Sequence, residues 1–212
     1  MVLGANDGVI SVASLTVGIA ASGADAGSVL LSCIAASVAG GVSMAAGEYV
    51  SVCSQADTER ADLALERRLL RDHPAAELEE LSGIYRKRGL SADLAREVAE
   101  QLTLHDALSA HARDEIGLTD TLRARPLQAA LASGASFLAG ALVPILTLLL
   151  TPDEATAAAL VVTSLLALAA LGALSARIGR APIGPAALRT SLWGALALAL
   201  TTLVGRAFGV AA

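Results

Sequence analysis

The chain has 212 residues, of which 55% are hydrophobic and 17% are charged, and its mean hydropathy is +0.64. Soluble domains carry about 25% charged residues, so this composition predicts a membrane protein and excludes a disordered chain. Two cysteines are too few for disulfide bonds to stabilise a fold of this size, and a net charge of −5 argues against a nucleic-acid partner.

Uncharged segments recur along the chain at lengths that suit a bilayer, which needs about 20 apolar residues per helix. Five such segments lie at residues 8–24, 26–47, 126–152, 155–176 and 190–205. The last is short, so we expect its helix to continue past Arg206, whose side chain would reach back to the interface. The sequence therefore predicts an all-α membrane protein with five transmembrane helices.

The segment between spans two and three has a different composition. Residues 54–125 hold 15 of the 20 acidic residues, 11 of the 15 basic residues and all three histidines. Its periodicity predicts three helices, at about 54–72, 75–88 and 92–122, with Pro74 opening the second and Ser91 capping the third. We expect the first and third to continue spans two and three. The predicted domains are residues 1–53 (transmembrane helices 1 and 2), 54–125 (a cytoplasmic helical domain) and 126–212 (transmembrane helices 3 to 5).

Basic residues predict the orientation of the spans. Arg60, Arg123 and Arg125 flank the central segment and three arginines lie within 177–189, whereas the connections around Asp25 and at 153–154 have no basic residue. By the positive-inside rule, the N-terminus and the central domain are cytoplasmic. Basic residues comprise 14 arginines and one lysine, which favours a bacterial protein of the inner (plasma) membrane.

Two acidic residues fall within or at the edge of the first two spans. Asp7 and Glu48 are costly in a bilayer, which indicates an ion path; the alternative is that each lies at an interface, Asp7 as a helix cap. Met44 lies one helical turn before Glu48 and would add a thioether. A methionine in a span most often serves packing, but beside carboxylates it suits a first-row divalent metal.

A second group of acidic residues lies in the central segment. Glu77 and Glu80 are three residues apart, and His111 and Glu115 are four apart, so each pair shares a helix face. Carboxylates with one imidazole suit Fe(II), Mn(II) or Zn(II); the alternative is a solvated acidic face. The chain has no nucleophile elbow, phosphate-binding loop or Cys-x-x-Cys motif, so we expect no enzyme activity and no cofactor.

Several motifs together resemble the vacuolar iron transporter family. They are Leu3-Gly4-Ala5-Asn6-Asp7-Gly8, the run Ser43-Met44-Ala45-Ala46-Gly47-Glu48-Tyr49-Val50-Ser51-Val52, and Glu77-Leu78-Glu79-Glu80-Leu81 followed by Ile84-Tyr85 and Arg88-Gly89-Leu90. The resemblance covers nearly the whole chain. It implies a dimeric five-span transporter that moves Fe(II), and often Mn(II), out of the cytosol in exchange for protons, with a cytoplasmic domain that gathers metal.

The resemblance also assigns roles to single residues. It places the pore aspartate at Asp7 and the pore methionine at Met44, and it matches cytoplasmic glutamates to Glu66, Glu77, Glu80 and Glu115. Three positions depart from the family pattern: Leu69 stands where a further glutamate is usual, Ala36 stands where some members have an acid two turns before the methionine, and His111 replaces a methionine ligand. We therefore expect a reduced number of metals in the central domain.

These observations predict a proton-coupled exporter of ferrous iron, with Mn(II) as a further substrate. Asp7, Met44 and Glu48 form its expected transport path, and Glu66, Glu77, Glu80, His111 and Glu115 its expected cytoplasmic metal site. Two other functions stay open at this point, a membrane-anchored metal sensor and a passive divalent-cation channel. The expected partners are metal ions, protons, lipid and a second copy of the chain.

Overall fold

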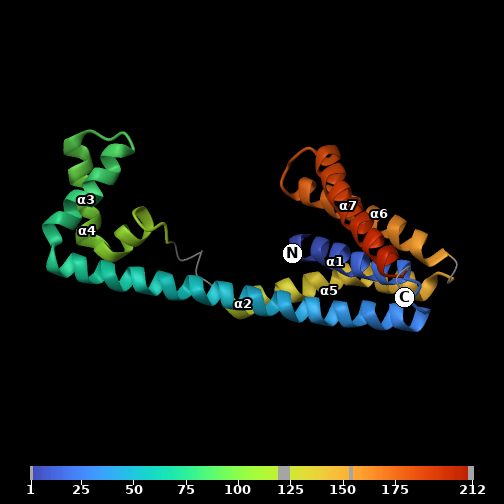
Figure 1. The fold of residues 1–212 in the computed structure, drawn as a ribbon. Helices are drawn as coiled ribbons and strands as arrows, with labels where there is room; N and C mark the ends of the chain where they lie inside the picture. The colour runs from blue at the N-terminus through green and yellow to red at the C-terminus, as the bar shows by residue number, and fades with distance from the viewer. Residues whose placement is uncertain (1, 119–124, 153–154, 210–212) are drawn as a thin grey trace. The chain divides into compact units, whose positions relative to one another are not determined.

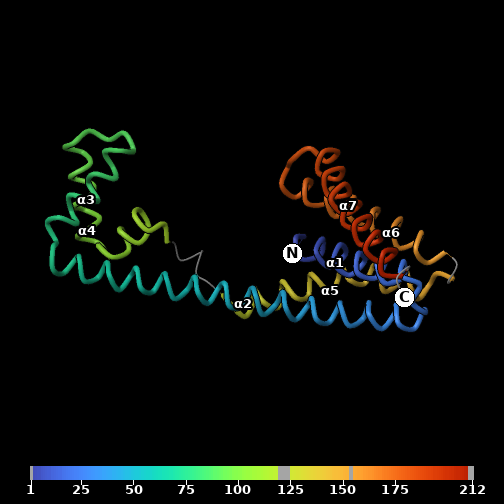
Figure 2. Tube along the Cα trace, viewed as in Figure 1, coloured from blue at the N-terminus to red at the C-terminus, as the bar shows by residue number. Residues whose placement is uncertain are grey.

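The computed structural model describes residues 2–118, 125–152 and 155–209 (Figure 1; Figure 2). All regular structure in these ranges is helical, as predicted: α1 (Val2–Ala21), α2 (Ala26–Asp72), α3 (Pro74–Lys87), α4 (Ala92–Asp114), α5 (Pro126–Leu150), α6 (Thr156–Ile178) and α7 (Ile183–Gly209). The chain divides into two compact units. We call residues 1–49 and 127–212 the membrane unit and residues 50–126 the central unit, and each is described by itself.

Within the described ranges, five helices are long and apolar enough to cross a membrane, namely α1, α2, α5, α6 and α7, so the chain is a multi-pass membrane protein. The predicted number of spans is confirmed. The last predicted span was short, but α7 has 27 residues and includes both Arg189 and Arg206. At about 1.5 Å per residue this helix is long enough for a hydrocarbon core of about 30 Å.

In the membrane unit, α1 is packed on several sides. Glycines allow α1 and α5 to touch, because a Cβ atom on Gly8 would collide with the Phe137 carbonyl and one on Gly140 with the Ala5 carbonyl. Residues of α1, α6 and α7 form an apolar core made of Ala13, Val17, Leu160 and Leu198. A membrane-buried helix gains stability from such close backbone approach rather than from exclusion of water.

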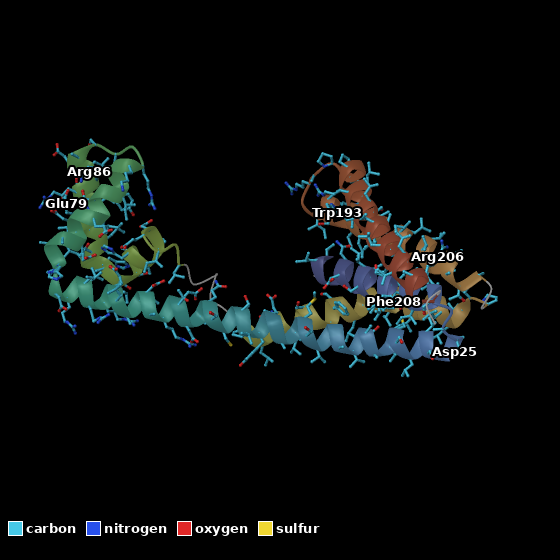
Figure 3. All side chains as sticks on the ribbon, viewed as in Figure 1. Asp25, Glu79, Arg86, Trp193, Arg206 and Phe208 are labelled. Atoms are coloured by element: carbon cyan, nitrogen blue, oxygen red, sulfur yellow. The ribbon has the colours of Figure 1, made fainter. Side chains whose placement is uncertain are left out.

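Helix α2 runs through 47 residues without a break. Asp25 caps its start, where the carboxylate accepts hydrogen bonds from the Ser28 backbone N–H at 3.0 Å and the Ser28 hydroxyl at 2.6 Å (Figure 3). Neither glycine nor proline occurs between Gly47 and Pro74, so nothing in the sequence ends the helix earlier. The predicted continuation of span two into the first central helix is confirmed.

In the central unit, α3 and α4 pack around Leu81, Ala99 and Ala110. Pro74 is the first residue of α3 and Ser91 caps α4, accepting a hydrogen bond from the Leu94 N–H at 3.5 Å, as predicted.

The predicted end of the third helix at residue 122 is wrong. Helix α4 ends at Asp114, and Gly117 then adopts a positive φ of 80° that a helix does not accommodate. Residues 115–118 therefore interrupt the expected continuation into span three. The remainder of the predicted helix, together with Arg123 and the 153–154 connection, lies outside the described residues.

Helix α4 also has an internal break. Asp106 leaves the helical conformation, with φ −162° and ψ 93°, and its carboxylate accepts a hydrogen bond from the Ser109 N–H at 3.0 Å. That bond is typical of an N-cap, so a short second segment starts after Asp106. We call residues 107–114 the terminal segment of α4.

Candidate functional site

Four side chains of the central unit converge on one point. Glu66 comes from α2, Glu77 from the first turn of α3, His111 from the terminal segment of α4, and Glu115 directly follows that segment. One ligand atom from each lies within 4.8 Å of all the others. The structure therefore brings together four of the five residues expected to hold metal in this domain.

His111 lies at the centre of the group. Its Nδ1 atom is 2.9 Å from a Glu115 oxygen, 3.1 Å from a Glu66 oxygen and 3.9 Å from a Glu77 oxygen. The His111 side chain is fully buried, and those of Glu66 and Glu77 are 4% and 7% exposed, whereas Glu115 is 32% exposed. Three of the four candidate ligands are thus withdrawn from solvent, and Glu115 faces it.

The hydrogen bonds of this group are incomplete. A single N–H on His111 Nδ1 cannot satisfy two carboxylates, and within the described part of the chain neither Glu66 Oε1 nor His111 Nε2 has a hydrogen-bond partner. Buried polar atoms are rarely left in this state. Glu66 Oε1 lies 3.1 Å from His111 Nδ1 without forming a hydrogen bond, and a cation bound among the acids of this group would satisfy it.

The electrostatics of the group also favour a bound cation or a proton. Burial, together with repulsion from Glu115, raises the pKa of Glu66, and nearby His111 only partly offsets this. Burial and repulsion from Glu80 likewise raise the pKa of Glu77. Concentrated negative charge in a buried place favours either protonation or a cation.

Glu80, the fifth expected ligand, lies outside the four-atom group. Its side chain is exposed on α3, one turn beyond Glu77. Its charge nevertheless contributes to the raised pKa of both Glu66 and Glu77. The structure therefore places Glu80 beside the group as a source of negative potential.

A second arrangement lies in the membrane unit. Asp7 of α1 and Met44 of α2 line one open groove, together with Ser11, Ser43, Gly40 and Phe137. The Ser11 hydroxyl donates a hydrogen bond to Asp7 Oδ1 at 2.7 Å. Gly4 of α1 faces the Met44 sulfur, since a Cβ atom on Gly4 would lie 3.4 Å from it, in ordinary van der Waals contact. A carboxylate and a thioether on one groove suit a first-row divalent cation.

Glu48, the third residue of the expected transport path, is not among the residues that line this groove. It follows Met44 by one turn of α2 and its side chain is exposed.

Sequence reasoning missed several neighbours of both arrangements. Ser11 is one turn from Asp7, so helix spacing alone could have found it. Phe137 comes from α5 and lies over Gly40 of α2, a contact that no spacing within one helix can reveal. In the central unit, Tyr85, Arg88 and Asp114 form a hydrogen-bonded group beside the ligands that was also missed.

Comparison with known proteins identifies the family of this chain. A family model described as the VIT family matches residues 1–206. A vacuolar iron transporter of Acanthamoeba castellanii is 45% identical over 205 residues, covering 96% of this chain and 76% of that protein. Vacuolar iron transporter homolog 1 of Oryza sativa is 35% identical over 99% of this chain and 72% of its own length. The VIT-like transporter 1b of Glycine max is 32% identical over 100% of this chain and 76% of its own length. From this match across nearly the whole chain we conclude that the protein belongs to the VIT family, whose members are transporters and not enzymes.

Proposed function

We propose that this protein exports ferrous iron from the cytosol, with Mn(II) as a second substrate, in exchange for protons. The carrying observation is the groove of the membrane unit, where the Asp7 carboxylate and the Met44 thioether are exposed to the same space. An ionisable group in a membrane span is a functional feature by default, because its burial in lipid is costly. The relatives named vacuolar iron transporters support iron as the cargo.

Coupling to protons follows from the chemistry of a shared ligand. A carboxylate binds a divalent cation only when it is ionised, so a metal ion and a proton compete for Asp7. On the proposed mechanism, Asp7 takes metal on the cytosolic side and a proton on the opposite side, which links the two fluxes. Ser11 orients the carboxylate through its 2.7 Å hydrogen bond. Glu48, exposed one turn along α2 from Met44, is proposed as the first acid that the metal meets.

The central unit is proposed to collect metal before transport. Glu66, Glu77, His111 and Glu115 would supply the ligands, and Glu80 would raise the local negative potential. Entry would pass Glu115, which is the most exposed of the four side chains. Oxygen-rich ligation with a single imidazole suits Fe(II) and Mn(II).

Orientation and assembly complete the proposal. Three exposed arginines lie at the facing ends of α6 and α7, Arg177 in α6, Arg180 between the helices and Arg189 in α7. Together with the exposed Arg60 of the central unit, they support a cytoplasmic location for this connection and for the central unit, and we place the protein in the plasma membrane of a bacterial cell. A homodimer is supported by the open groove, because a polar groove with Asp7 cannot face hydrocarbon and a second copy would cover it.

Reconstitution into liposomes tests the function. Fe(II) and Mn(II) uptake is measured with and without an imposed pH difference, while a trapped dye reports internal pH. The proposed exchanger takes up metal faster with an opposing proton gradient and moves protons as metal enters. Metal flux without proton movement would indicate a passive channel, and no flux would indicate a membrane-anchored sensor.

A further inference from the structure

One buried carboxylate of the central unit has no part in the proposed ligand set. The Asp114 side chain is 7% exposed and accepts hydrogen bonds from the Tyr85 hydroxyl at 2.7 Å, from Arg88 Nη1 at 2.7 Å and from Arg113 Nη2 at 2.7 Å. Tyr85 belongs to α3 and Arg88 directly follows it, whereas Arg113 and Asp114 end α4. The carboxylate therefore joins the C-terminal ends of two helices.

Arg88 makes two further contacts at this junction. Its guanidinium lies 5.2 Å from the centre of the Tyr85 ring, and its second terminal nitrogen donates a hydrogen bond to the Asp114 backbone carbonyl at 3.3 Å. A cation at the carbonyl end of a helix is favourable both as a hydrogen-bond donor and through the helix dipole. Burial would raise the pKa of Asp114, but hydrogen bonds from Arg113, Arg88 and Tyr85 lower it well below its usual range.

The terminal segment of α4 is held by tertiary contacts, which are the packing of Ala110 against Leu81 and Ala99 and the hydrogen bonds of Asp114, which we call the tether. Residues 107–114 form about two helical turns, and the break at Asp106 removes the continuous hydrogen-bond ladder that would tie them to the first part of α4. Helices this short are marginal without tertiary contacts. His111 lies on this segment, three residues before Asp114, and Glu115 follows Asp114 directly.

We propose that Asp114 is a positioning residue, which ties the terminal segment of α4 to Tyr85 and Arg88 and thereby holds His111 and Glu115 against Glu66 and Glu77. This inference rests on the proposed metal site of the central unit. Asp114 touches no metal in this scheme. Its removal would leave all four ligands in the chain while loosening the pair that comes from α4.

The test uses the full chain in nanodiscs with Mn(II) as the probe. Pulsed electron paramagnetic resonance detects nitrogen coupling when Mn(II) is bound by an imidazole, and all three histidines of the chain lie in the central unit. Glu66→Gln and His111→Ala report on the site itself. Asp114→Asn, Tyr85→Phe and Arg88→Ala report on the tether, and Arg88→Lys restores the charge. The matched control is Glu79→Gln, which breaks the exposed ion pair of Glu79 with Arg86 on α3 at 2.8 Å (Figure 3).

We expect Asp114→Asn to weaken Mn(II) binding on the order of tenfold, at the low end of what supporting residues contribute to metal sites. At saturating Mn(II) the nitrogen coupling should shrink or vanish, which a mere loss of stability would not cause in folded protein. Arg88→Ala should act in the same way, with Arg88→Lys recovering part of the signal, and Glu79→Gln should match the unmodified protein.

The outcomes separate the two proposals. If His111→Ala keeps the nitrogen coupling, or the unmodified protein lacks it, the proposed site itself fails. If His111→Ala loses the coupling but Asp114→Asn keeps both coupling and affinity, only the positioning role is overturned. Should Asp114→Asn not fold, as judged by size-exclusion chromatography, Tyr85→Phe and Arg88→Ala decide: unchanged coupling in both overturns the role, and reduced coupling supports it.

Discussion

His111 presents one ring nitrogen to three carboxylates, of Glu115, Glu66 and Glu77, at distances from 2.9 to 3.9 Å. One proton cannot neutralise three acids, and two of these acids are almost fully buried. The arrangement is therefore unstable by itself and becomes favourable when a cation replaces or joins the proton.

Glu66→Gln tests this imbalance. Because the fold raises the pKa of Glu66, protonated Glu66 favours the fold, and this contribution is lost as pH rises from about 4.3 through the raised pKa. At pH 7.5 without metal, the backbone amides of α3 and α4 should therefore be better protected from hydrogen exchange in Glu66→Gln than in the unmodified protein, by about 1 kcal/mol of opening free energy.

Hydrogen exchange followed by mass spectrometry on peptides of α3 and α4 measures this protection with and without Mn(II). In the unmodified protein, Mn(II) at 100 times its Kd should add about 2.7 kcal/mol of protection, and Glu66→Gln should lose most of this gain. A variant that is less protected without metal than the unmodified protein would contradict the electrostatic account.

Met44 should govern selectivity at the membrane groove. A thioether is a soft ligand, which favours Fe(II) over the harder Mn(II). Met44→Ala should therefore reduce Fe(II) uptake into liposomes on the order of tenfold and Mn(II) uptake by less. Ser43→Ala, which changes the neighbouring residue of the same groove, serves as the control. Equal losses for both metals in Met44→Ala would show that the sulfur has no selective role.

At the scale of the helices, glycines decide where α1 can pack. Gly8 and Gly140 bring α1 and α5 into backbone contact, whereas a Cβ atom on Gly47 of α2 would meet no atom of the described residues within 4 Å. The same residue type thus serves packing at one position and leaves a helix surface open at another.

The pair Gly8→Ala and Gly47→Ala tests this difference. Gly8→Ala should lower stability by about 1–3 kcal/mol, the usual cost of overpacking. Gly47→Ala should be neutral or stabilising by up to about 1 kcal/mol, because alanine is the better helix former. Thermal unfolding in detergent, with monodispersity checked by size exclusion, measures both. Similar midpoints for the two variants would contradict the packing at Gly8.

The limits of sequence-based prediction also appear at the level of elements. Gaps between charged residues located all five spans, and the expected continuation of span two into the central segment is confirmed by α2, in which no glycine or proline lies between Gly47 and Pro74. The end of α4 was misplaced because helical periodicity continues past Asp114 although Gly117 turns the backbone. Spacing within one helix paired His111 with Glu115, but the convergence of Glu66, Glu77 and His111 depends on how three helices pack, which periodicity does not specify.

At the scale of the whole molecule, the proposed transport path and the proposed collecting site belong to different units. Asp7 and Met44 lie in the membrane unit, and Glu66, Glu77, His111 and Glu115 in the central unit. If the collecting site only supplies metal to the path, the two sets of residues should affect different kinetic quantities.

Asp7→Asn and His111→Ala should therefore behave in opposite ways. Asp7→Asn removes the ionisable ligand that metal and proton share, so both fluxes should vanish, while nitrogen-coupled Mn(II) binding persists because the histidines are untouched. His111→Ala should lose that binding signal and need a higher metal concentration for half-maximal uptake, yet approach the unmodified maximal rate. Uptake measured over a range of Mn(II) concentrations, beside the resonance spectra, distinguishes these effects. A maximal rate that falls in His111→Ala as far as in Asp7→Asn would mean that the central unit takes part in the transport step itself, since a site that only gathers metal is bypassed when metal is abundant.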